Sequence, residues 1–269
     1  MTALHPALFI GHGSPMQAIE PSRYSAAWQQ LGRSLPRPRA ILAVSAHWYT
    51  QGTGVTVAAQ PQTIHDFYGF PAPMYQLRYP ARGDASLAAQ VQAQLAPTAV
   101  QADSEWGLDH GSWVVLQYMY PQADIPTVQL SIDATLSPRQ HYQLGGKLRA
   151  LRAQGVLLLG SGNVVHNLRV MQRSASAPAP AWATQFNAAL RAAVLANDHE
   201  SLIEFHRLGG SASAGERPGS AARLSVPTPE HYLPLLYVLG AQAEGEPVSI
   251  PVDGIDLGSI SMLSVQLGG

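Results

Sequence analysis

The chain has 269 residues, with 16 basic and 17 acidic side chains, ten histidines and no cysteine. Without cysteine there is no disulfide, no thiolate metal site and no cysteine nucleophile, so any metal or covalent chemistry must use other side chains. The near-neutral charge predicts no nucleic-acid partner, because phosphate binding needs clustered Lys and Arg. Charged residues are only 12% of the chain, below the ~25% typical of soluble domains, and this favours a homodimer.

The N-terminal sequence and the apolar segments predict a cytoplasmic protein that does not enter a membrane. The first residues, MTALHPALFIGHG, lack the basic region and the small-residue cleavage site of a signal peptide. The apolar runs are all shorter than the ~20 residues that span a bilayer. We find no internal repeat and no central linker, so residues 1–269 are expected to form a single domain.

Short β-rich apolar runs alternate with segments of helical character along the chain. Strands are predicted at residues 7–10, 40–45, 54–58, 98–101, 127–132, 156–159, 248–252 and 260–266. Helices are predicted at residues 22–31, 84–95, 112–119, 137–152, 182–195, 199–205 and 230–239. This alternation predicts an α/β fold. Its central sheet is expected to be mixed but mostly parallel, flanked by helices on both faces, with the last two strands as an antiparallel pair.

Two segments interrupt this alternation. Residues 174–180 (SASAPAP) are small, polar and rich in proline, and they predict a surface loop. Residues 209–222 (GGSASAGERPGSAA) have low complexity and precede a histidine of the candidate site. We interpret them as an exposed connection, with a lid over that site as the alternative.

Three histidines come at or shortly after the ends of predicted strands. His12 lies in FIGHGSP, His47 in AVSAHWYT and His166 in LLLGSGNVVHNL. In an open α/β sheet the ligand crevice lies at the carboxyl edge of the strands, so these side chains are expected to converge there. Gly11 and Gly13 on either side of His12 permit backbone conformations that other residues avoid.

A fourth histidine, His231 in VPTPEHYLPLLYVLG, is predicted in the first turn of a helix. Thr228 is a suitable N-cap, Pro229 suits the first helical position and Glu230 suits the positive end of the helix. Four imidazoles, or three and a water, are a competent ligand set for zinc or ferrous iron. The predicted ligands of one divalent metal ion are His12, His47, His166 and His231.

Two further clusters combine aromatic and polar residues. In TIHDFYGFP, His65 and Asp66 precede three aromatic residues, and in WGLDHGSW, Asp109 and His110 lie between two tryptophans. Aromatic walls with a few polar groups suit a planar aromatic ligand, although such rings also fill ordinary cores. We predict that His65 and Asp109 bind the substrate and that His110 stabilises a developing oxyanion.

Six motifs follow one another along almost the whole chain: GHGSP, SAHW, TIHDFYGFP, DHGSW, SGNVVHNL and PTPEHYLPLLYVLG. With them the sequence resembles the DOPA-type class III extradiol ring-cleavage dioxygenases, the 4,5-DOPA dioxygenase extradiol family, and especially its bacterial members. The resemblance implies a fold like that of the catalytic subunit of protocatechuate 4,5-dioxygenase. It also implies one non-haem divalent metal and cleavage of a catechol ring with O2.

The resemblance implies roles for individual residues. His12, His47 and His231 match metal ligands, whereas His166 matches a residue that is either a fourth ligand or the acid/base group beside the metal. Protocatechuate-type relatives have a glutamate in place of His231, and an all-histidine site favours zinc more than a carboxylate-containing site does. His110 matches a histidine near the substrate, where it has a catalytic role as a hydrogen-bond donor.

Three functions are compatible with these residues. In a catechol dioxygenase both substrate hydroxyls bind Fe(II), His166 removes a proton, and His166 and His110 later return protons. In a zinc hydrolase the same histidines lower the pKa of a bound water to ~7. A non-catalytic metal-binding module is the third reading. The sequence leaves open the catechol, the choice between zinc and Fe(II), and the oligomeric state.

Overall fold

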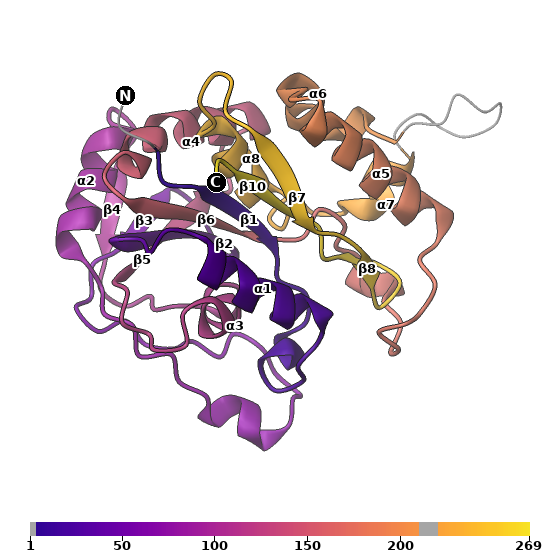
Figure 1. Ribbon diagram of the computed structural model, residues 1–269, viewed down its shortest axis with the longest axis horizontal. Coiled ribbons are helices and arrows are strands. Elements are labelled where there is room, and N and C mark those ends of the chain that lie inside the picture. Colours follow the sequence, from indigo (N-terminus) through magenta and orange to yellow (C-terminus); the bar gives the residue numbers. More distant parts are fainter. Residues whose placement is uncertain (1–3, 210–219) are drawn as a thin grey trace.

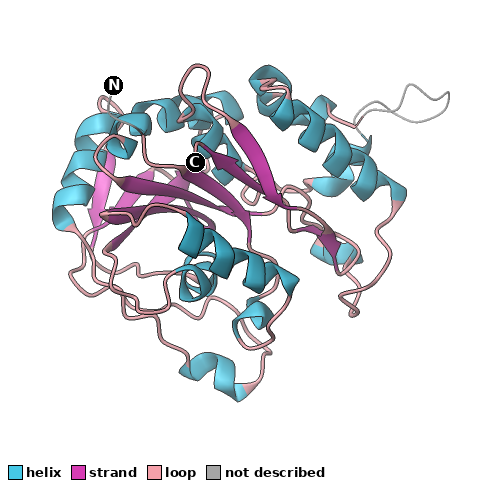
Figure 2. Ribbon diagram, in the orientation of Figure 1, coloured by secondary structure: helices cyan, strands magenta, loops and turns pink. Residues whose placement is uncertain are grey.

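A central sheet of eight strands lies between two layers of helices in the computed structural model, which describes residues 4–209 and 220–269 (Figures 1 and 2). The strand order is β4-β3-β5-β2-β6-β1-β10-β7. The strands of this sheet are β1 (Ala7–Gly11), β2 (Ala40–Thr50), β3 (Thr53–Thr56), β4 (Val100–Asp103), β5 (Thr127–Asp133), β6 (Val156–Gly162), β7 (Val248–Val252) and β10 (Ser264–Leu267). A separate two-stranded sheet is formed by β8 (Ile255–Asp256) and β9 (Ile260–Ser261).

The sheet is mixed, with three of its four parallel pairs in the middle and the fourth at one edge. β2 is parallel to both β5 and β6, β1 is parallel to β6, and β3 is parallel to β4. β10 is antiparallel to β1 and β7, and β3 is antiparallel to β5. The predicted mixed sheet and its antiparallel last pair are therefore confirmed. The parallel strands β1, β2 and β6 are adjacent, so their carboxyl ends share one edge.

Helices cover both faces of the sheet, as the alternation of elements predicts (Figure 2). One layer contains α1 (Arg23–Ser34) and α3 (His110–Met119), and the other contains α2 (Ala85–Leu95), α4 (Pro138–Arg152) and α8 (Leu233–Gly240). Beside α8 and β7 lie α5 (Ala181–Leu195), α6 (His199–Ile203) and α7 (Ser220–Ser225). Successive side chains of a strand point to opposite faces. Accordingly Leu8 and Ile10 of β1 pack in one layer and Phe9 in the other.

Capping residues fix where two of these helices begin. Ser137 accepts a hydrogen bond from the backbone N–H of Gln140, and the Gln140 side chain accepts from the backbone N–H of Ser137, at the start of α4. Asp109 accepts from the backbone N–H of Ser112 at the start of α3. Such caps satisfy N–H groups that have no partner within the helix. Helix α3 therefore begins at His110.

The helix that follows His231 begins later than predicted. α8 starts at Leu233, with Pro234 in its first turn, and the predicted cap and first-turn roles of Thr228 and Pro229 are wrong. Proline suits a first helical turn because it has no N–H to leave unsatisfied, and this sequence offers two such prolines. His231 consequently lies in a turn just before the helix.

Strand β2 is longer than predicted, and its end is irregular. It continues beyond residue 45 to Thr50 and so contains His47. Its pairing with β5 changes register between Val44 and Tyr49. A register change of this kind bends a strand and redirects its side chains, and such irregularities are frequent next to active sites.

The two irregular segments differ in how far the structure describes them. Residues 174–180 form a largely exposed loop, as predicted. Of the predicted connection at 209–222, residues 210–219 lie outside the described part, and with them the lid interpretation. Residues 220–222 belong to α7, where Ala221 and Ala222 are buried, so the predicted connection ends too late. Within residues 4–209 and 220–269 every helix is too short or too polar to span a bilayer.

Candidate metal centre

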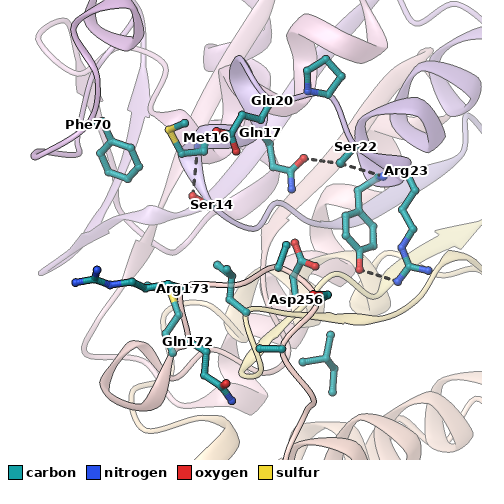
Figure 3. A pocket seen from close by; sticks show the side chains of 18 residues that line it. Ser14, Met16, Gln17, Glu20, Ser22, Arg23, Phe70, Gln172, Arg173 and Asp256 are labelled. Carbon is teal, nitrogen blue, oxygen red and sulfur yellow. Dashed lines mark hydrogen bonds between the residues drawn. The ribbon is translucent and has the colours of Figure 1, made fainter.

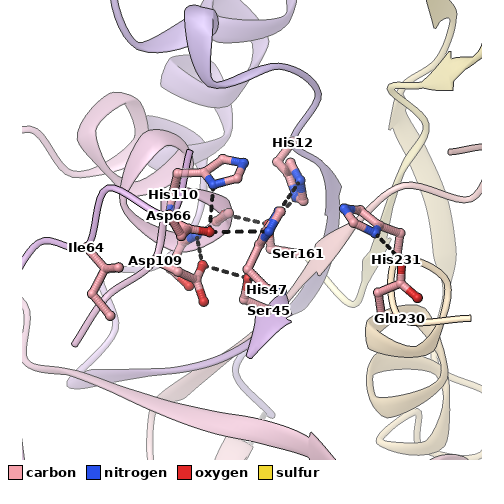
Figure 4. Close-up of polar contacts among 12 residues, drawn as sticks. His12, Ser45, His47, Ile64, Asp66, Asp109, His110, Ser161, Glu230 and His231 are labelled. Atoms are coloured by element: carbon pink, nitrogen blue, oxygen red, sulfur yellow. Dashed lines mark hydrogen bonds and ion pairs between the residues drawn. The ribbon is translucent and has the colours of Figure 1, made fainter. Parts of the chain in front are cut away.

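Three of the four predicted ligands meet at one point. His12, His47 and His231 place their candidate ligand nitrogens within 4.8 Å of one another. The Nε2 atoms of His12 and His47 are 3.1 Å apart, and Figure 4 shows His231 approaching the pair from the other side. His12 directly follows β1 and His47 lies near the end of β2, so both occupy the carboxyl edge of the parallel strands.

The end of β6 holds His231 beside the other two rings. The backbone N–H of Asn163 donates to the carbonyl oxygen of His231 at 2.9 Å, and that of His12 donates to the carbonyl of Gly162 at 3.1 Å. Position 162 must be glycine for this approach, because a Cβ there would lie 2.1 Å from the His231 carbonyl oxygen. The three histidines are thus brought together by neighbouring backbone segments.

The tautomer of His12 follows from a chain of hydrogen bonds behind it. Nδ1 of His12 lies 3.0 Å from Oγ of Ser161, and the Ser161 hydroxyl donates its only proton to the carbonyl of Gly111. Ser161 can therefore only accept from His12. His12 carries its proton on Nδ1, and its Nε2 presents a lone pair.

Carboxylates fix the tautomers of the His47 and His231 rings in the same way. Nδ1 of His47 lies 3.3 Å from Oδ2 of Asp66, and Nδ1 of His231 lies 3.2 Å from Oε1 of Glu230 (Figure 4). A carboxylate only accepts hydrogen bonds, so both rings are protonated on Nδ1 and present a lone pair on Nε2. Glu230 thereby lies behind His231, and it also accepts from the hydroxyl of Thr228.

This donor set fits a divalent metal ion. Burial lowers the pKa of His12, His47 and His231, so that all three imidazoles are neutral ligands. The Nε2 atom of His231 is buried and has no hydrogen-bond partner among the described residues. The Nε2 lone pairs of His12 and His47 face each other at 3.1 Å and repel unless a cation lies between them. Each ring also has the outer hydrogen-bond partner that metal-bound histidines usually have.

The fourth predicted ligand, His166, lies beside this group. Its ring stacks on that of His231, with the centroids 3.5 Å apart and an interplanar angle of 10°. Imidazole lone pairs lie in the ring plane, so stacked rings aim their nitrogens side by side and do not converge on one ion. Burial and the neighbouring His231 lower the pKa of His166 to about 2, so its ring is also neutral. This geometry favours the acid/base role over that of a fourth ligand.

Asp66 connects the metal centre to His110. Its carboxylate accepts from the backbone N–H of His110 at 2.9 Å, from Nδ1 of His110 at 2.9 Å and from Nδ1 of His47. Burial favours the protonated acid, but the hydrogen bonds from His110 outweigh it and lower the pKa of Asp66. The sequence motifs predicted no individual role for Asp66. Its position next to an aromatic run was the only signal.

The two residues predicted to bind substrate are not brought to the cavity that adjoins the histidines. Nε2 of His65 lies 3.1 Å from the carbonyl oxygen of Leu77. Asp109 is fully buried, where it accepts from the hydroxyl of Ser45 and the amide of Gln129. Burial raises the pKa of Asp109 to about 6, with a further contribution from the charge of Asp66. The side chains that reach the cavity are those of the next residues, Asp66 and His110.

A cavity of about 320 Å³ opens in front of the histidines, and we call it the ring cavity. Its polar side contains the metal-centre histidines, His110, His166 and Asp66, and its opposite walls are mainly apolar. The residues of these walls include Phe67, Tyr68, Phe70, Leu168, Met171 and Ile260. A mainly apolar cavity lined on one side by polar groups suits an aromatic ligand whose polar edge faces the metal centre.

Replacement of Asp66 by Asn should weaken metal binding without unfolding the protein. The amide is a poorer acceptor for Nδ1 of His47 and His110, and loss of such outer partners typically costs ~10–100-fold in metal affinity. We expect a loss in this range for Zn²⁺ and Fe²⁺, measured by competition with a chromophoric chelator. The control Asp124→Asn removes an exposed carboxylate that pairs with Arg37 and should leave the affinity unchanged. Wild-type affinity in Asp66→Asn would contradict the role of this carboxylate.

Comparisons with known proteins identify the family of the chain. The family model described as the catalytic LigB subunit of aromatic ring-opening dioxygenase matches residues 6–224. The chain therefore belongs to this family of ring-opening dioxygenases. It is 53% identical over 265 residues to the 4,5-DOPA dioxygenase extradiol of Escherichia coli K12, covering 98% of this chain and 94% of that relative. It is 37% identical over 259 residues to the 4,5-DOPA dioxygenase extradiol of Beta vulgaris, covering 94% and 92%.

A solved structure shows the same fold. The crystal structure of an uncharacterized protein from Escherichia coli K12 has a TM-score of 0.81 and 48% sequence identity, and the match covers 98% of this chain and all of that one. The family, the fold and the enzyme class expected from the sequence motifs are thereby confirmed. The zinc hydrolase alternative is not favoured.

Proposed function

We propose that the protein opens the ring of a catechol such as DOPA with O2, with a single Fe(II) ion held by Nε2 of His12, His47 and His231. The observation that supports this most is that three imidazoles, each fixed at Nδ1 by a hydrogen-bond partner, place their candidate ligand nitrogens within 4.8 Å of one another at the ring cavity. Zinc binds the same nitrogen donors but has no redox chemistry, so we propose Fe(II) for the active form.

The metal would supply two things when bound: it would acidify the catechol hydroxyls, and it would connect the ring and O2 for electron transfer. His12, His47 and His231 would hold the ion, and the ring cavity that they line would receive the substrate and O2. The substrate ring would lie between the apolar walls that include Phe67 and Phe70, with both hydroxyls at the histidine end. The ring bond next to the two hydroxyl-bearing carbons breaks, and both oxygen atoms of O2 enter the product.

His166 would act as the proton acceptor in this reaction. It lines the ring cavity and is neutral, so one of its ring nitrogens can take a proton from a catechol hydroxyl. The negative charge of the deprotonated substrate would then stabilise the imidazolium of His166, because an opposite charge nearby favours the charged form. The same proton is available later, when an oxygen of the opened ring needs one.

His110 would help to position the substrate in the ring cavity. It also lines the ring cavity, and Asp66 fixes its orientation through Nδ1 and the backbone N–H. Its Nε2 remains for the substrate or for O2. Asp109 would fix the position of His110 relative to β2. It caps helix α3, which starts at His110, and it accepts a hydrogen bond from the hydroxyl of Ser45 in β2. In this proposal Asp109 is a positioning residue, and His65 has no contact with the substrate.

Oxygen consumption tests the proposed activity. The protein is loaded with Fe(II) without air, and oxygen uptake is followed with L-DOPA, 4-methylcatechol and hydroquinone. We expect about one O2 consumed per catechol and a yellow ring-opened product, with no reaction of hydroquinone, whose hydroxyls cannot bind one metal ion together. Protein loaded with Zn²⁺ should consume no oxygen. No uptake with any catechol, or release of one H2O2 per O2 without ring opening, would refute the proposal.

A further inference from the structure

A second and larger cavity adjoins the ring cavity. It has a volume of about 810 Å³, and we call it the outer chamber (Figure 3). The two cavities share four lining residues, which are Ser14, Phe70, Met171 and Leu257. Three of these are apolar, so an apolar neck separates the histidines from the outer chamber. A substituent on a ring bound in the ring cavity has this neck as a route outwards.

The outer chamber carries charges of both signs, unlike the apolar walls of the ring cavity. Its charged lining residues are Glu20, Arg23, Arg173 and Asp256. Arg23 is already engaged: its guanidinium donates to the hydroxyl of Tyr24 at 2.8 Å and lies 4.7 Å from the centre of that ring. Its charge also opposes the rise that burial causes in the pKa of Asp256. These two residues therefore compensate each other at one end of the chamber.

The other two charges have no such compensation. Within residues 4–209 and 220–269, neither the Glu20 nor the Arg173 side chain has a hydrogen-bond or ion-pair partner, although both line the same chamber. Figure 3 shows Arg173 on the side of Phe70, which is the side shared with the ring cavity, and Arg23 on the opposite side. A ring substituent that passes the apolar neck thus reaches the Arg173 side of the chamber first.

We propose, building on the proposed function, that the outer chamber binds an amino-acid substituent of the catechol. Arg173 pairs with its carboxylate, and Glu20 pairs with its ammonium group. Guanidinium and carboxylate match as a planar fork with two parallel hydrogen bonds. On this assignment Arg173 and Glu20 set a preference for zwitterionic catechols, and they do so in the outer chamber and not at the metal centre.

The expected effect is on substrate binding and not on chemistry. Both side chains are exposed, so solvent reduces the strength of a charged hydrogen bond to either of them. We expect about a tenfold rise in KM when one partner of a pair is removed, which corresponds to ~1.4 kcal/mol. The value of kcat should stay within about twofold, because the contact is the same in the ground state and the transition state.

Four catechols and two variants test the assignment. L-DOPA has both charges, 3-(3,4-dihydroxyphenyl)propionate has only the carboxylate, dopamine has only the ammonium group, and 4-methylcatechol has neither. Arg173→Gln should raise KM about tenfold for the first two, and Glu20→Gln should do so for L-DOPA and dopamine. The control is Arg169→Gln, in the neighbouring short helix η3 (Leu168–Val170). Arg169 is exposed and lines neither cavity, so this variant should change no KM.

Two other results would overturn the assignment. One is an equal rise in KM for 4-methylcatechol, and the other is unchanged KM for the carboxylates in Arg173→Gln; in both cases ring opening itself still stands. If the wild type opens no catechol ring, the proposed function fails. Calorimetric titration of the metal-loaded protein without air then decides this inference. Tighter binding of the propionate than of 4-methylcatechol, lost in Arg173→Gln, supports it, and equal binding of the two refutes it.

Discussion

His12→Ala should abolish specific metal binding while the protein stays folded. The substitution leaves two of three Nε2 ligands, and the loss of a direct ligand exceeds the ~10–100-fold that loss of an outer partner costs. We therefore expect metal affinity to fall by more than ~100-fold, and ring opening to fall with it. The fold should tolerate the change, because the Nε2 lone pairs of His12 and His47, 3.1 Å apart, repel each other unless a cation lies between them, and the variant removes that repulsion.

Thermal unfolding gives a readout that does not depend on activity. A metal that binds only the folded protein raises the free energy of unfolding by ~2.7 kcal/mol at a hundredfold excess over Kd, and the Tm rises with it. The wild type should show this rise with Zn²⁺, and His12→Ala should not. His206→Ala removes an exposed histidine from outside the site and should behave like the wild type. A metal-induced rise of normal size in His12→Ala would show that the ion binds elsewhere.

The sequence was sufficient to predict the strand-end histidines, because each follows an apolar run that only a buried strand explains. His12, His47 and His166 all lie at the carboxyl edge that the alternation of strands and helices implies. The layers on both faces followed from the same alternation. The start of α8 did not follow, because Pro229 and Pro234 are equally suited to a first helical turn, and local rules give no preference between them.

Local sequence rules could not predict the hydrogen bonds that the predicted metal ligands make at Nδ1. The proton on His12 is fixed by Ser161, 149 residues away, and that of His47 by Asp66 in a loop with no regular structure. The sequence motif predicted that His65 binds the substrate, but it is the next residue, Asp66, whose side chain reaches the ring cavity. Neighbouring side chains of a loop point in different directions, and only the packing of the whole loop decides which one faces inwards.

His166→Ala should lower kcat strongly while metal binding remains nearly intact. General acid–base catalysis typically contributes ~10²–10⁴-fold, and we expect a loss of kcat in this range. The stacked rings of His166 and His231 aim their lone pairs side by side, so removal of His166 leaves the three converging nitrogens in place. Metal affinity, measured by chelator competition as for His12→Ala, should change by less than the ~10-fold that marks loss of an outer partner.

The comparison of these two histidine variants decides between the two roles of His166. A fall in metal affinity as large as that of His12→Ala would make His166 a fourth ligand, and normal kcat would remove it from the reaction altogether. Added imidazole gives a further distinction, since it fits the space that the alanine variant opens beside His231. A freely diffusing base in that space should restore part of the turnover of His166→Ala if the missing function is proton transfer. It should not do so in His12→Ala, where the defect is in the metal centre itself.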